Sequence, residues 1–187
     1  MQIAVTYRRT SRLSISVGRR GDVRVSAPFG LPQEEIERFV NEKSDWIAKA
    51  RSRVLERLEK RNDFFGLLPL STKEDCKAAT DRLNALIMPL LEKYTKLMGV
   101  RPNGIEYKAT TSRWGCCLPK TKRLQFSAYL LLLPEWCVEH VVVHELAHLI
   151  VPNHSPKFHA VMDKYFPRWR EARKETARVS RMETPYL

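Results

Sequence analysis

One stretch in the last third of the chain decides the fold, and it reads Trp136-Cys-Val-Glu-His-Val-Val-Val-His-Glu-Leu-Ala-His148. Its first half is apolar enough to predict a buried helix. Residues four apart lie on one face of a helix, so His144 and His148 can reach the same metal ion. Glu145 projects beside them, where a carboxylate can act as general base on a metal-bound water. The stretch therefore predicts an HExxH zinc site on a rigid helix.

The third ligand is predicted to be His154, because a catalytic zinc ion usually has three protein ligands and keeps one position open for water. Pro152 disfavours a helical residue before it, and Asn153 tolerates the left-handed conformation of a helix cap, so the two end the helix. Ser155-Pro156 has the pattern of an N-cap followed by the first residue of a new helix. His154 would then lie at a tight corner between two helices, where it completes a site for one Zn²⁺ per chain.

Two further histidines lie close to this motif in the sequence. His140 is one turn before His144 on the same helix face, and His159 is one turn into the following helix. We interpret both first as ordinary helix or core residues. Hydrolysis of an amide would also need a donor for the developing oxyanion. The sequence offers Arg113, His140, His159 and Tyr165 for that role and does not choose among them.

A small antiparallel sheet is predicted directly before the metal helix, and the sheet would pack on that helix. Its strands are expected at residues 104–110, 113–117 and 123–128. Many zinc peptidases hold an extended peptide along a sheet edge beside the metal helix. Gly115 would permit close approach of a substrate backbone, and Trp114 would supply an apolar floor. The alternative is that Trp114 is a core residue and Gly115 marks a bulge.

The N-terminal part of the chain is predicted to be an antiparallel β unit followed by a long helix. Residues 3–7, 12–17 and 23–27 alternate apolar and polar side chains. Pro32 opens the long helix, and a second long helix is expected over residues 73–98, with a kink at Pro89 and a cap at Gly99. A soft boundary in residues 62–72 divides the chain into residues 1–62 and a metal-binding domain at residues 73–187.

The charge of the chain is strongly positive, at +12 over 187 residues. Residues 1–31 contain six arginines and one aspartate, and residues 108–123 contain five basic residues and no acid. Such a field attracts polyanions, of which nucleic acid is the obvious one. The alternative is a solvated basic surface without a partner.

Three further features bear on location. No apolar run approaches the length that spans a membrane. The N-terminal residues lack the order of a signal peptide. The four cysteines show no CxxC spacing, so they are interpreted as reduced thiols of a cytoplasmic protein. The sequence does not indicate an oligomeric state.

These residues together resemble the YgjP-like (DUF45) metallopeptidase family, which is similar to the SprT and WLM zinc proteases. The resemblance is carried by residues 111–117, 124–127, 133–136, 141–148 and 153–155, with Phe158. It implies a zincin-like, minimal gluzincin domain of the α+β class in which the three histidines of the motif bind the metal and Glu145 is catalytic. It also implies that Arg113, Trp114 and Gly115 line the edge of the active site.

The sequence thus predicts a zinc metalloprotease that hydrolyses peptide bonds in proteins or peptides, with nucleic-acid-associated proteins as one class of substrate. Two alternatives stay open. One is a non-enzymatic nucleic-acid-binding module whose zinc only stabilises the fold, although a structural site normally uses more cysteine and does not need Glu145. The other is a zinc amidohydrolase that acts on a non-peptide bond.

Overall fold

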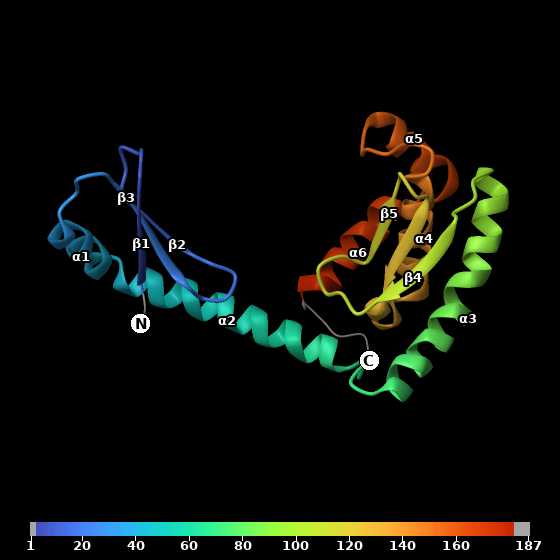
Figure 1. Cartoon of the computed structure of the whole chain (residues 1–187), viewed down its shortest axis with the longest axis horizontal. Coiled ribbons are helices and arrows are strands. Elements are labelled where there is room, and N and C mark those ends of the chain that lie inside the picture. The colour runs from blue at the N-terminus through green and yellow to red at the C-terminus, as the bar shows by residue number, and fades with distance from the viewer. Residues whose placement is uncertain (1–2, 182–187) are drawn as a thin grey trace. The chain divides into compact units, whose positions relative to one another are not determined.

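The fold is mixed α+β, as the sequence predicts. The computed structural model describes residues 3–181, and these residues form two three-stranded sheets and six α-helices (Figure 1). The chain divides into two compact units, Met1–Asn62 (unit 1) and Asp63–Leu187 (unit 2). Residues 1–2 and 182–187, which the predicted domain ranges include, lie outside the described residues.

The sheet of unit 1 is mixed rather than antiparallel. Its strands are β1 (Ile3–Arg8), β2 (Ser14–Val17) and β3 (Val23–Pro28), in the order β1-β3-β2. β2 and β3 form an antiparallel hairpin, closed by a hydrogen bond of 2.7 Å from the Gly18 N–H to the Asp22 carbonyl. β1 pairs with the other edge of β3 and runs parallel to it. The predicted antiparallel unit is therefore wrong for β1, because β3 returns between β1 and β2 instead of continuing a meander.

Two helices replace the single long helix predicted after Pro32. They are α1 (Gln33–Glu42) and α2 (Ser44–Gly66). Lys43, between them, has φ −99° and ψ 9°, in the bridge region outside the helical well, so the helix is interrupted there. Ile36 on α1 packs in a small core with Val25 and Ala27 of β3, and α1 therefore covers one face of the sheet.

Unit 2 begins its regular structure with α3 (Lys73–Met98). Thr72 and Asp75 form a capping box at its start, in which each side chain accepts a hydrogen bond from the other residue's backbone N–H. The helix continues through Pro89 to Met98. Gly99 then ends it at φ 66°, a left-handed conformation that glycine adopts without steric cost, and this confirms the predicted cap.

The second sheet is formed by β4 (Gly104–Lys108), β5 (Gly115–Leu118) and β6 (Arg123–Ser127), in the order β4-β6-β5. β5 and β6 form an antiparallel hairpin, whereas β4 runs parallel to β6. The antiparallel sheet predicted from the sequence is therefore wrong at β4. The cause is again non-local, because β6 enters the sheet between the two strands that precede it.

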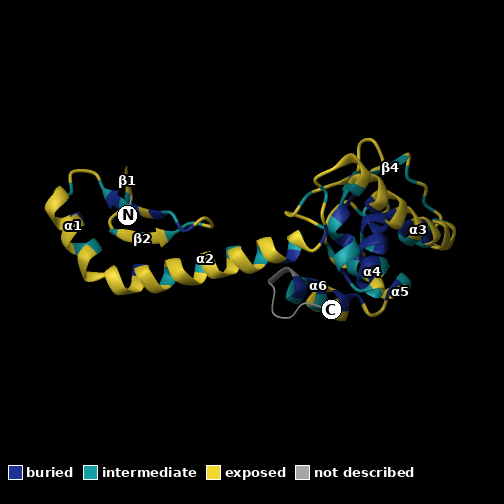
Figure 2. Cartoon of the chain, turned by 90° about the horizontal axis from the view of Figure 1, so that it is seen from below, coloured by how far each residue is buried: buried dark blue, intermediate teal, exposed yellow. Residues whose placement is uncertain are grey.

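A short 3₁₀ helix, η1 (Ala128–Leu132), connects the sheet to α4 (Glu135–Ala147), and α5 (Pro156–Tyr165) and α6 (Trp169–Arg181) complete the described chain. α4 packs against α3, α5, α6 and β5, and Figure 2 shows it mostly in the colour of buried residues. Val138 and Val142 are fully buried, whereas Glu135 at the start of the helix is exposed. A helix packed against four other elements holds its buried side chains in fixed positions.

Within residues 3–181, no helix is both long enough and apolar enough to cross a membrane.

Candidate metal centre and active site

The end of α4 places two of the three predicted metal-binding side chains. The helix ends at Ala147, and His148 is its C-cap, with its N–H donating to the His144 carbonyl. The regular α-helix ends five residues before Pro152, where the Leu149 and Ile150 N–H groups donate to carbonyls three residues back, on Leu146 and Ala147, at 3.0 Å each. The helix thus ends earlier than the proline predicts, although His144 and His148 are still one turn apart.

His154 returns to the same place from the following loop. The side chain of Asn153 accepts a hydrogen bond from the Ser155 N–H, which tightens the corner before α5. His154 Nε2 lies 3.0 Å from His144 Nε2, and potential ligand atoms of His144, His148 and His154 all lie within 4.8 Å of one another. The structure therefore brings together the three side chains that the sequence singled out for a metal.

The ring of Phe158 packs against all three imidazoles. Its centroid lies 4.9 Å from that of His144, 4.6 Å from that of His148 and 4.8 Å from that of His154. Phe158 is buried, so it forms a fixed base against which the imidazoles rest.

Hydrogen bonding and burial prepare the imidazoles for a metal. His148 Nδ1 lies 3.2 Å from the Val151 carbonyl, a contact that suits an Nδ1–H donor and leaves Nε2 as the free ligand atom. Burial, with the neighbouring histidines and Arg173, lowers the pKa of His144 to about 3. A neutral imidazole is the form that binds metal.

Glu145 lies against Gly115, at the contact between α4 and β5. It is only 5% exposed, and its carboxylate accepts a hydrogen bond from the Cys117 backbone N–H. Burial raises the pKa of Glu145 to about 7, although the Cys117 hydrogen bond and the Arg113 charge act in the opposite direction. Near neutral pH the carboxyl can therefore both take and return a proton.

Gly115 lies directly over this carboxylate. A Cβ at position 115 would lie 2.6 Å from Glu145 Oε1 and 2.7 Å from its Cγ, closer than real Cβ contacts. The sequence suggested that this glycine allows a substrate backbone to approach. The neighbour that requires the glycine in this structure is Glu145 itself.

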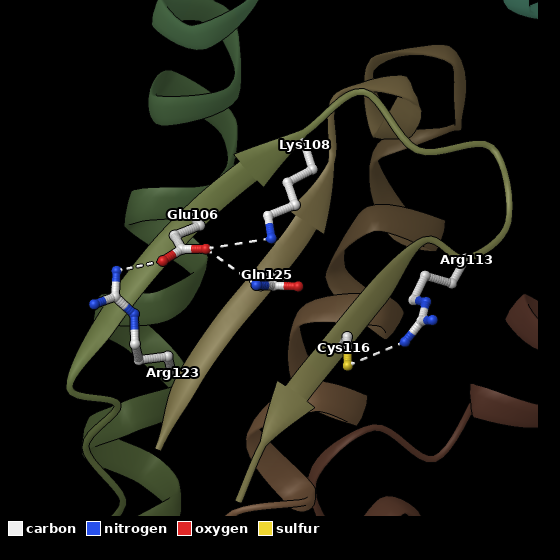
Figure 3. A network of polar contacts seen from close by, with 6 residues as sticks. All are labelled: Glu106, Lys108, Arg113, Cys116, Arg123 and Gln125. Atoms are coloured by element: carbon white, nitrogen blue, oxygen red, sulfur yellow. Dashed lines mark hydrogen bonds and ion pairs between the residues drawn. The ribbon is translucent and has the colours of Figure 1, made fainter. Parts of the chain in front are cut away.

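Arg113 and Trp114 directly precede β5 and differ in burial. Arg113 is exposed, and its Nη1 lies 3.4 Å from Cys116 Sγ (Figure 3). Trp114 is half-buried, with its ring 6.2 Å from that of Phe65, and its carbonyl accepts a hydrogen bond from the Ser127 N–H. Trp114 is thus partly a packing residue and partly a wall of the site.

Polar side chains brace the sheet on the face that carries Cys116. Glu106 on β4 receives a hydrogen bond of 3.0 Å from Gln125 on β6 and pairs with Arg123 and Lys108 (Figure 3). Strand register places Glu106, Gln125 and Cys116 side by side. The network therefore links β4 to β6, the central strand, with which β5 also pairs.

A cavity of about 330 Å³ opens beside the histidines and Glu145. Its lining residues come from β5, α4 and α6, and they are Trp114, Gly115, His140, Val141, His144, Glu145, Arg173, Thr176 and Ala177. The α6 residues were not found from the sequence. No spacing rule connects Arg173 to the motif on α4, and only the packing of α6 on α4 brings them together.

The four predicted oxyanion donors are dispersed. His140 lines the cavity and is buried, and its Nδ1 has no hydrogen-bond partner within residues 3–181. Burial, followed by the Arg173 charge, lowers the pKa of His140 to about 4. His159 instead stacks on Trp169, with ring centroids 4.9 Å apart and planes 7° apart. His159, Tyr165 and Arg113 are not among the residues that line the cavity.

The donor set fits a metal ion of a particular kind. Three imidazoles converge without cysteine or carboxylate among them, which is a ligand set that Zn²⁺ accepts in catalytic sites with one position open. A buried carboxyl stands next to the first histidine, and the cavity adjoins both.

The family comparison agrees with the chemistry of the site. The sequence profile described as YgjP-like, metallopeptidase domain, matches residues 11–67 and 74–178. Among solved structures, the chain is similar to the crystal structure of the metallopeptidase zymogen of Pyrococcus abyssi abylysin. The identity is 22%, the TM-score is 0.45, and the match covers 54% of this chain and 99% of that chain. The comparison with curated proteins gives no match.

Proposed function

The chain belongs to the YgjP-like metallopeptidase domain family, and from this premise we propose that it is a zinc metallopeptidase that hydrolyses peptide bonds in proteins or peptides. His144, His148 and His154 would hold one Zn²⁺ ion, and Glu145 would be the general base. The observation that carries the proposal is the convergence of three imidazoles beside a buried carboxyl at the mouth of a cavity.

Zinc, when bound, lowers the pKa of a water ligand and polarises the scissile carbonyl. Glu145 takes a proton from the attacking water and delivers it to the leaving amine. A carboxyl whose pKa is near neutrality suits both transfers. The hydrogen bond from the Cys117 N–H holds the carboxylate in one orientation, so the proton acceptor is preorganised.

We place the substrate backbone along the free edge of β5, which pairs with β6 on its other side only. An extended peptide can add to such an edge through main-chain hydrogen bonds. Arg113, Trp114 and Gly115 would then lie along the bound peptide, in the zincin-like arrangement that the family resemblance implies.

Arg173 is our preferred stabiliser of the oxyanion, with His140 as the second candidate. Both line the cavity, and Arg173 carries a permanent positive charge whose guanidinium can donate to a developing negative oxygen. His140 is neutral because burial lowers its pKa, so it could offer only an N–H dipole.

The arrangement of Glu145 favours an enzyme over a zinc-stabilised binding module. A structural zinc site has no need of a carboxyl that is buried at a cost and faces a cavity. A zinc amidohydrolase would use the same groups, so only the preferred bond separates it from a peptidase.

The test combines metal content with cleavage. Wild type, Glu145→Gln, His154→Ala and His159→Gln would be analysed for zinc by elemental analysis and assayed on an unstructured protein and on a panel of non-peptide amides. We expect about one zinc per chain in wild type, Glu145→Gln and His159→Gln, with zinc lost from His154→Ala. His159 is the matched control because it is a histidine of α5 that stacks on Trp169.

Cleavage of the protein substrate by wild type and His159→Gln, but not by Glu145→Gln, would support the peptidase. Zinc with cleavage of the amides alone would assign the site to an amidohydrolase. Wild type without zinc, or His154→Ala with full zinc, would contradict the proposed centre.

A further inference from the structure

The sheet of unit 1 has two unlike faces. The face that packs on α1 contains Val25 and Ala27, and Ile36 of α1 completes this core. Register and alternation place a different set on the opposite face, which we call the outer face. It carries Ala4, Thr6, Arg8, Ser14, Ser16, Arg24, Ser26 and Pro28. All of these except the half-buried Ser26 and Pro28 are exposed, and β2 alternates exposed and half-buried residues.

Arginines lie at both ends of this sheet. Arg19, Arg20 and Arg24 lie at or next to the β2–β3 hairpin, and Arg8 and Arg9 lie at the opposite end, where β1 ends. Arg12 follows in the connection to β2. A strand of six residues such as β3 is about 20 Å long, so the positive charges form a track of roughly that length.

The charge on this track is nearly unopposed. Asp22 is the single acidic residue of positions 1–31, and it pairs with Arg24. Within the described part of the chain, the other five arginines of this segment form no ion pair. The helical part of unit 1, residues 32–62, holds eight basic and seven acidic residues and is nearly balanced. The excess positive charge of unit 1 therefore lies in residues 1–31, and a polyanion would approach the sheet.

We propose that the outer face binds nucleic acid through its phosphodiester backbone, without base preference. Every basic residue of positions 1–31 is arginine, whose planar guanidinium matches phosphate oxygens in a bidentate manner. The serine and threonine hydroxyls between the arginines are short donors of the kind that contact phosphates. The serine and threonine side chains of this face are small, so a backbone could lie close to the sheet.

The composition of the face argues against other polyanionic partners and against base stacking. The outer residues include no aromatic side chain, and the exposed Tyr7 and Val5 lie in register with Ala27 and Val25 on the other face. Bases would therefore have no platform on which to stack. An anionic membrane would be held by charge alone, because the face has no large apolar side chain to insert.

The inference is independent of the proposed peptidase activity. The outer face belongs to Met1–Asn62, whereas the candidate metal ligands and Glu145 belong to Asp63–Leu187. Loss of one function therefore leaves the other measurable.

The test is binding of fluorescent single-stranded and duplex DNA of mixed sequence to the full chain, measured by anisotropy over a series of KCl concentrations. The variant is the triple substitution Arg8→Gln, Arg12→Gln and Arg20→Gln. The matched control removes the same charge from the exposed helical positions of unit 1 through Arg38→Gln, Arg53→Gln and Arg57→Gln. Circular dichroism and melting temperature confirm that both variants fold.

We expect the outer-face variant to bind DNA at least about tenfold more weakly than wild type. The slope of log K against log[KCl] should become shallower by about two, because a protein that makes fewer phosphate contacts releases fewer counterions on binding. The control should stay close to wild type, and Glu145→Gln should bind as wild type does. Three results would overturn the proposal: no binding by wild type, equal loss in both triple variants, or tighter binding to phosphatidylserine vesicles than to either DNA.

Discussion

Gly115 on β5 and Glu145 on α4 are in direct contact, with no room for a methyl group between them. A Cβ built on Gly115 would lie 2.6 Å from Glu145 Oε1 and 2.9 Å from Cδ. The Cys117 N–H on the same strand donates to that carboxylate. The edge strand and the metal-site helix are thus joined through the proposed general base, and a change on the strand should appear in the chemistry.

Gly115→Ala tests this contact. The added methyl must push the Glu145 carboxylate away from the Cys117 N–H, so the base loses its orientation while the three histidines keep theirs. We expect kcat on a protein substrate to fall by at least about a hundredfold, the magnitude of a misplaced general base, with zinc content unchanged. Steady-state kinetics and elemental analysis measure the two effects.

Gly104→Ala is the control for that substitution. Gly104 also begins a strand, but the nearest atom to an added Cβ is Arg123 Cζ at 3.7 Å, an ordinary contact with a flexible side chain. Its kinetics should match wild type. If Gly115→Ala retained full activity, Glu145 would not need the orientation that the structure gives it.

Phe158→Leu tests whether the ring that packs against the three histidines contributes to metal affinity while the histidines themselves are unchanged. Leucine preserves an apolar side chain but removes the ring that contacts three imidazoles, so their relative positions become less defined. We expect zinc affinity to fall about tenfold, as when groups that orient metal ligands are lost. The cost in unfolding free energy should be about 1 kcal/mol. Competition with a chromogenic chelator measures the affinity.

Phe166→Leu provides the comparison, because Phe166 is also buried but its ring approaches His140, at 5.9 Å, rather than the three converging imidazoles. Phe166→Leu should lower the unfolding free energy by a similar amount and leave the zinc affinity unchanged. Equal losses of affinity in both variants would show that general core packing, not the ring beneath the imidazoles, governs the metal.

The convergence of the three histidines could be predicted from the sequence because its geometry is local. His144 and His148 are related by one helical turn, and His154 follows after a connection too short to carry it far. The end of α4 was predicted too late, since the Leu149 and Ile150 N–H groups already donate to carbonyls three residues back, before Pro152 can act.

Features that depend on distant segments could not be obtained in this way. The insertion of β3 between β1 and β2, and of β6 between β4 and β5, leaves no mark in strand alternation, which is the same for parallel and antiparallel pairs. Arg173 belongs to α6, whose sequence shows an amphipathic helix but not the cavity that one of its faces would enclose.

Glu139→Gln should lower stability in a pH-dependent manner. Glu139 accepts hydrogen bonds from Lys93 at 2.8 Å and Tyr94 at 2.7 Å, which link α4 to α3. Burial raises the pKa of Glu139, but the bonds from these two partners and the Lys93 charge outweigh it, so the net shift is downward from 4.5. A lowered folded-state pKa contributes stability that is present above the unfolded value and is lost as pH falls through the folded value.

Wild type should therefore exceed Glu139→Gln by about 1 kcal/mol in unfolding free energy at neutral pH, and the two should converge below pH 4.5. Urea denaturation at several pH values measures this difference. Glu92→Gln removes an exposed pair with Lys96 and should change stability much less. A constant difference between wild type and Glu139→Gln at all pH values would contradict the role of the charge.

Arg173→Gln tests the proposed stabiliser of the oxyanion, a residue that could not be predicted from the sequence. Arg173 lines the cavity with His144 and Glu145, and a charge that meets the oxyanion acts in the transition state more than in the bound substrate. We expect kcat to fall by about a hundredfold with KM little changed. Lys174→Gln, which removes a charge from the adjacent exposed position, should leave both constants near wild type. A rise in KM with kcat unchanged would instead show that Arg173 binds the substrate and the transition state equally well. His140 would then be the remaining candidate in the cavity for stabilising the oxyanion.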